Sequence, residues 1–131
     1  MNSNAKRRAM WAAQILAAAV MGQTLYFKFS GAPEPIYIFE TLGAEPWGRY
    51  GSGVLEAIAV LLLLIPRCAA LGGALTMGLM AGALGAHFTK LGIVVLDDGG
   101  TLFGMALVTF AAATFVTWSR RRELPLIGHR F

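Results

Sequence analysis

Two side chains in this sequence, Glu56 and His87, could exchange protons inside an apolar environment. Glu56 interrupts the apolar run 51–65, where a carboxylate is costly unless it faces a protein interior and finds a partner. An ionisable residue in such a position normally marks a functional site. A carboxylate and an imidazole can act as general acid and general base. Glu56 and His87 are therefore the candidate catalytic residues.

Helical spacing gives this pair neighbours. Residues at i, i+4 and i+7 share one face of a helix, which places Arg49 and Gly53 on the same face as Glu56. The same periodicity aligns polar residues and methionines on the apolar segments before and after this one. The sequence therefore predicts one site, with the ligand-binding residues Lys28, Thr24, Arg49, Glu56, Met80 and His87.

Each of these residues also has a purely structural interpretation. Lys28 could extend its amine to the lipid headgroups, as lysines near span ends commonly do. Glu56 could form an ion pair with Lys28 or Arg49 that only holds helices together, or be a protonated acid bonded to backbone. His87 could be a neutral histidine bonded to a neighbouring helix. Spacing alone leaves these alternatives open.

The elements that must position these residues are membrane helices. Of the 131 residues, 56% are hydrophobic and only 14% are charged, which is far from the composition of a soluble domain. A span needs about 20 mostly apolar residues. Four segments qualify, at 9–29, 47–65, 69–89 and 101–118. The sequence predicts an all-α integral membrane four-helix bundle that forms a single domain over residues 1–131.

Lysine and arginine indicate the orientation. In a four-span arrangement, eight of the eleven fall on one side of the membrane: Lys6, Arg7, Arg8, Arg67, Arg120, Arg121, Arg122 and Arg130. The positive-inside rule makes that side cytoplasmic. We therefore expect both termini in the cytoplasm, a cytoplasmic tail at 119–131, and a multi-pass protein of the plasma (inner) membrane. The first outer loop, 30–46, should contain a short amphipathic helix at the interface.

Several classes of function are disfavoured. The single cysteine, Cys68, excludes an internal disulfide, and two distant histidines, His87 and His129, predict no metal site. Most basic residues lie at span ends, so the net charge of +4 does not indicate nucleic-acid binding. Small residues recur at every fourth position from Ala74 to Ala86, which predicts close packing of this helix in lipid.

Several motifs resemble one known family. They are Lys28-Phe-Ser-Gly31, Phe39 with Leu42-Gly43, Gly53-Val-Leu-Glu56 running through leucines to Pro66-Arg67, and Met80 through Ala86-His87. This pattern, over about residues 9–118, is similar to the DoxX and DoxX-like membrane proteins. The longer members carry a glycine-rich segment ending in Ser-Leu-Asp after the last helix. Here Ser119-Arg-Arg-Arg-Glu123 follows instead, which is closer to the short DoxX-like branch.

The resemblance implies a small four-helix membrane partner of redox enzymes, in a family most of whose members have no established activity. From the residues and this resemblance, we expect a membrane subunit or binding module that holds a quinone-like lipophile at an outer-leaflet site around Glu56. Expected partners are the lipid bilayer, a small lipophilic ligand, membrane or soluble redox proteins, and further copies of the chain. Two alternatives stay open: an isomerase-like enzyme that uses Glu56 and His87 for proton transfer, and a structural scaffold.

Overall fold

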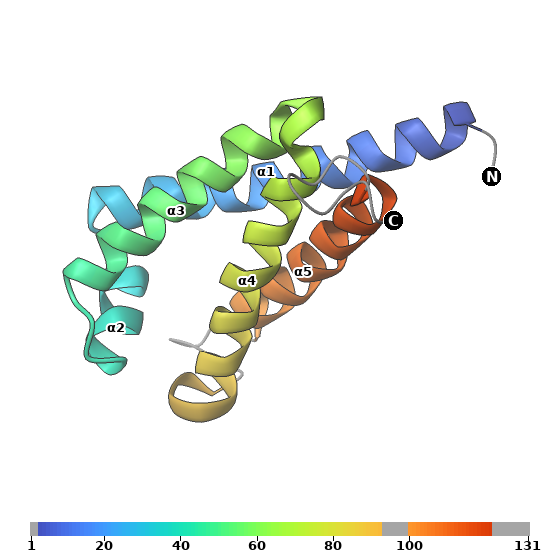
Figure 1. Ribbon diagram of the computed structural model, residues 1–131. Coiled ribbons are helices and arrows are strands. Elements are labelled where there is room, and N and C mark those ends of the chain that lie inside the picture. Colours follow the sequence, from blue (N-terminus) through green and yellow to red (C-terminus); the bar gives the residue numbers. More distant parts are fainter. Residues whose placement is uncertain (1–2, 93–99, 122–131) are drawn as a thin grey trace.

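Four long helices form the body of the protein in a computed structural model, which describes residues 3–92 and 100–121 (Figure 1). The helices are α1 (Ser3–Ser30), α2 (Pro33–Thr41), α3 (Trp47–Leu64), α4 (Ala69–Ala86) and α5 (Thr101–Ser119), with a 3-10 turn η1 (Pro66–Cys68) and a π-helical turn η2 (His87–Leu91). The described residues contain no strand. Beyond residue 121 the predicted tail, with Arg122, Arg130 and His129, lies outside the described residues.

The four spans predicted from sequence coincide with helices that are long and apolar enough to cross a membrane: Asn4–Ser30, Trp47–Leu64, Pro66–Leu91 and Thr101–Ser119. Large apolar side chains such as Ile15, Leu61 and Leu107 are exposed on their outer surfaces. A soluble protein rarely exposes so much apolar area, whereas lipid would cover it. The prediction of an all-α chain with four such helices is confirmed, and a multi-pass membrane protein is indicated.

Prolines and glycines set the boundaries between these helices. Pro66 follows the extended residue Ile65 and ends α3, because proline lacks an amide proton and disfavours helix in the residue before it. Pro33 begins α2, where a first-turn proline loses no hydrogen bond. Gly31 and Gly43, on either side of α2, adopt φ of 75° and 74°, a conformation that suits glycine. Residues 30–46 thus contain a short helix, α2.

The four long helices pack around a square, in which α1 contacts α3 and α5, and α4 contacts α3 and α5. Figure 1 shows that the pair α1–α3 and the pair α4–α5 meet at one end and diverge toward the other. The closed end holds the start of α1, the turn η1 and the end of α5, and is called the terminal end below. The diverging end, where α2 lies against α1, α3 and η2, is called the α2 end.

Small residues permit the close approach at the terminal end. A Cβ atom on Gly72 would lie 2.7 Å from the Leu63 amide nitrogen, and one on Gly73 would lie 3.0 Å from the Ala113 carbonyl oxygen. The predicted stripe from Ala74 to Ala86 behaves differently, because Gly78 and Gly82 face open space with no described atom within 4 Å of such a Cβ. Among the glycines of α4, Gly72 and Gly73 are therefore the ones that allow close approach of other helices within this chain.

Candidate functional site

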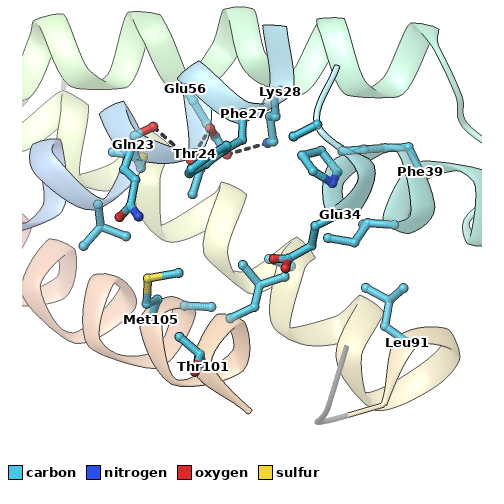
Figure 2. Close-up of a pocket in the computed structure, with 18 of the residues that line it drawn as sticks. Gln23, Thr24, Phe27, Lys28, Glu34, Phe39, Glu56, Leu91, Thr101 and Met105 are labelled. Atoms are coloured by element: carbon cyan, nitrogen blue, oxygen red, sulfur yellow. Dashed lines mark hydrogen bonds and ion pairs between the residues drawn. The ribbon is translucent and has the colours of Figure 1, made fainter. Parts of the chain in front are cut away.

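A cavity of about 650 Å³ opens between the two helix pairs at the α2 end (Figure 2). Its wall is mostly apolar and takes residues from every helix of the fold. The polar and sulfur-containing side chains in this wall include Gln23, Thr24, Lys28, Glu34, Glu56, Met80, His87, Thr101 and Met105. Five of the six ligand-binding residues predicted from sequence thus surround one space, and the sixth, Arg49, does not line it.

Glu56 forms the centre of a hydrogen-bonded network on one wall of the cavity. Lys28 Nζ on α1 lies 2.7 Å from Glu56 Oε1, and the Thr24 hydroxyl donates to Oε2 at 3.0 Å (Figure 2). Lys28 also donates to the Ser52 hydroxyl at 3.0 Å. The Lys28 and Glu56 side chains are 13% and 7% exposed, so each charge is compensated where solvent is scarce. Of the structural alternatives for Glu56, the geometry corresponds to the ion pair with Lys28.

Arg49 reaches Glu56 only indirectly. Its guanidinium pairs with Glu45, with Nε 2.9 Å and 3.0 Å from the two carboxylate oxygens, and lies over the Tyr50 ring. Its Nη1 donates to the Lys28 carbonyl oxygen near the end of α1. Arg49 therefore ties α3 to the backbone of the residue that pairs with Glu56. We interpret it as a positioning residue.

Gly53 makes room for the aromatic ring of Phe29. The ring of Phe29 lies so close that a Cβ on Gly53 would be 2.8 Å from Phe29 Cζ. Phe29 in turn stacks on Tyr50, with 6.0 Å between ring centroids. Arg49, Gly53 and Glu56 are all buried, as their shared helical face predicts.

His87 is 3% exposed, and only one of its ring nitrogens has a partner. Nδ1 lies 2.8 Å from the Ala83 carbonyl oxygen, while Nε2 has no hydrogen-bond partner among the described residues. The ring packs against Phe103 at 5.5 Å between centroids. Buried polar atoms are normally satisfied, so this nitrogen, which is covered by protein atoms and has no partner, is an exception.

The π-helical turn after α4 changes which residues reach the cavity. A regular helix would place Lys90, three residues after His87, close to the face of His87. The wider turn η2 instead buries Leu91 and leaves Lys90 exposed. Single π-helical turns occur frequently at functional sites. Here the turn removes one cation from the cavity and adds an apolar side chain.

Sequence reasoning missed several lining residues. Glu34 in α2 was placed in an interfacial loop helix, yet its carboxylate reaches into the cavity (Figure 2). Gln23, Phe27, Phe39 and Met105 also line the cavity, and none of them is among the six binding residues predicted from sequence. For Glu34 and Phe39 the sequence contains no periodic signal, because their positions depend on how α2 folds against α1, α3 and η2.

The terminal end also holds a buried polar residue, with a different environment. The Gln14 amide donates to the Leu63 carbonyl oxygen at 2.7 Å and accepts from Arg120 Nε at 2.8 Å. Gln14 is fully buried, and its contacts join α1 to α3 and to the end of α5. Both polar atoms of its amide form hydrogen bonds, so Gln14 has a structural role in connecting these helices.

Searches against family models, curated proteins and solved structures returned no match for this chain. Within the described residues, no group of three or more His, Cys, Asp or Glu side chains could hold a metal ion. Chemical assignment of the site therefore rests on the cavity and its polar groups.

Proposed function

We propose that this chain is a DoxX-like membrane protein that binds a small lipophilic molecule, a quinone or a compound of similar shape, in the cavity at the α2 end. In this proposal the chain has no activity of its own and serves a redox system as a membrane subunit or binding module. Its partners are the bilayer, the lipophile and redox proteins in or beside the membrane, and homo-oligomers are compatible with it.

The observation that carries this proposal is a mostly apolar cavity with a few fixed polar groups. Its volume of about 650 Å³ falls within the range of roughly 300–1,000 Å³ usual for small-molecule sites. The ion pair of Glu56 and Lys28 and the Thr24 hydroxyl could orient a polar head, while the apolar wall accepts a ring or chain. Such a combination suits a lipophile better than a charged metabolite.

The bonding of Glu56 gives it a role in the binding site that needs no proton transfer. One carboxylate oxygen accepts from the Lys28 ammonium, and the other lies 3.0 Å from the Thr24 hydroxyl, which also lies 2.8 Å from the Met21 carbonyl oxygen. A carboxylate has about four acceptor positions, so these contacts hold Glu56 in place and leave lone pairs for a ligand. If Glu56 and His87 did catalyse an isomerisation, His87→Ala would abolish turnover of a candidate substrate while binding persisted.

Mass spectrometry of organic extracts from the purified protein tests the proposal. We expect a quinone-like lipophile to co-purify with the wild type, and to be lost from Ala83→Phe, which fills the cavity from α4. The matched control is Ala81→Phe, at an exposed position on the same helix. If wild-type extracts contain no such compound and added decyl-benzoquinone does not bind, the proposal fails.

The proposed orientation places the terminal end in the cytoplasm and α2 at the outer surface of the inner membrane, because eight of eleven basic residues would then be cytoplasmic. The single cysteine offers a direct test, since Cys68 lies in η1 at the terminal end. A membrane-impermeant maleimide should label Cys68 only after permeabilisation. The matched variant Cys68→Ser/Glu40→Cys, with its cysteine on an exposed position of α2, should be labelled in intact cells. The opposite pattern would reverse the topology.

A further inference from the structure

A groove of about 460 Å³ runs between α1 and α5 in the half of each helix that is nearer the terminal end. Every residue that lines it is apolar, and most of the wall is formed by Ala12, Ala13, Leu16, Ala111, Ala112 and Phe115. Leu16 and Phe115 are 43% and 37% exposed, so the groove opens on the surface that lipid would cover. Small alanines between larger apolar side chains form a channel that suits one hydrocarbon chain.

Cationic side chains continue both walls of this groove toward the terminal end. On α1, Arg8 precedes Ala12 by four residues and therefore lies on the same face, one turn nearer the terminal end. On α5, Ala111 and Trp118 are seven residues apart and also share a face. The guanidinium carbon of Arg121 lies 4.3 Å from the centroid of the Trp118 ring. Each rim of the groove thus leads to an arginine at the terminal end.

The described part of the terminal end is cationic and has no acidic residue. The described segments 3–20, 62–75 and 111–121, which form this end, contain no Asp or Glu. Arg8 is exposed, and Arg121 donates one of its five N–H groups to a described acceptor, the Trp118 carbonyl oxygen. Donors and positive charge are therefore available to an anion from outside the chain.

We infer that this groove binds one acyl chain of an anionic phospholipid whose phosphate lies between Arg8 and Arg121. Basic pockets beside membrane helices bind anionic headgroups, and exposed tryptophans such as Trp118 lie at headgroup level. Arginine suits a phosphate because its planar donors can bond two oxygens at once. The groove shares no lining residue with the cavity at the α2 end, so this site does not depend on the lipophile proposed there.

Quenching of tryptophan fluorescence by brominated lipids tests the inference, because Trp11 and Trp118 lie at the terminal end and only Trp47 lies elsewhere. We would reconstitute a Trp47→Phe variant in dioleoyl-phosphatidylcholine at low salt, and compare dibrominated phosphatidylglycerol with dibrominated phosphatidylcholine. The anionic lipid should bind at least about tenfold more tightly, since each cation near the surface contributes roughly fivefold. Equal binding of the two lipids would overturn the inference.

Two double variants in this background separate a site from a diffuse attraction. Arg8→Gln/Arg121→Gln should reduce the preference for phosphatidylglycerol to within about twofold of one. The matched control, Arg7→Gln/Arg67→Gln, removes two cations at the same end but away from the rims, and should keep most of the preference. Equal losses in both variants would show a diffuse attraction and overturn the site.

Filling the groove tests the position of the acyl chain. Ala12→Phe should also abolish the preference, whereas Ala81→Phe, at an exposed position of α4 outside the groove, should keep it. Unchanged quenching by the brominated phosphatidylcholine shows that each variant is folded in the bilayer. A preference that survives Ala12→Phe would overturn the role of the groove.

Discussion

At the terminal end the buried amide of Gln14 has hydrogen-bond partners on α3 and just after α5. At the α2 end one buried ring nitrogen of His87 has no hydrogen-bond partner among the described residues. The packing differs in the same way. Gly72 and Gly73 bring backbones together at the terminal end, while the helix pairs separate around a cavity at the other. The bundle is thus closely packed at one end and encloses a cavity at the other. Breaking each end separately tests this division.

The largest effect is expected from breaking the Lys28–Glu56 pair at the α2 end. Lys28→Met would leave a buried, unpaired carboxylate and should lower the free energy of unfolding by about 3–5 kcal/mol. The double variant Lys28→Met/Glu56→Met removes both charges and should recover most of that loss. SDS-titrated unfolding, followed by tryptophan fluorescence, measures both. A single variant as stable as the wild type would mean that Lys28 extends to the headgroups instead.

At the terminal end, Gly72→Ala should cost about 1–3 kcal/mol, because the added Cβ would meet the backbone of α3 at Leu63 and Leu62, which cannot rotate away. Gly78→Ala is the matched control on the same helix, at a position facing open space. It should leave stability unchanged or raise it by up to about 1 kcal/mol through helix propensity. The same unfolding assay compares them. Equal effects would show that the terminal end is not closely packed.

Gln14→Leu should lower the free energy of unfolding by about 1–2 kcal/mol, because it removes two hydrogen bonds that link α1 to α3 and α5. Lipophile affinity should stay within about twofold of wild type, since the cavity lies at the other end. Calorimetry and SDS unfolding of the same preparation measure both quantities. Weakened binding in this variant would show that the two ends are coupled.

The smallest effect is expected from Lys90→Ala. The π-helical turn leaves Lys90 exposed, so stability should change by no more than about 0.5 kcal/mol and lipophile affinity should be unchanged. Weaker binding would indicate that residues 87–91 form a regular helix, in which Lys90 lies nearer the face of His87. The variant therefore tests the one irregular turn that borders the cavity.

Much of this architecture could be predicted from the order of residues. Apolar runs of about 20 residues determine four helices that are long and apolar enough to span a membrane. Pro66 determines where α3 ends, because a proline acts on the backbone of its immediate neighbours. The periodicity of 3.6 residues also placed Thr24 with Lys28, and Met80 with His87, on inward faces. These properties belong to each single helix and do not depend on how the helices pack.

Only the tertiary structure decided the pairings. Glu56 forms its ion pair with Lys28 and not with Arg49. The position of α2 brings Glu34 into the cavity wall, and the π-helical turn η2 leaves Lys90 outside it. The tertiary structure also placed the close contacts at Gly72 and Gly73 rather than along the stripe from Ala74 to Ala86. These outcomes depend on distances between helices and on one irregular turn. A periodic pattern within a single helix contains no information about either.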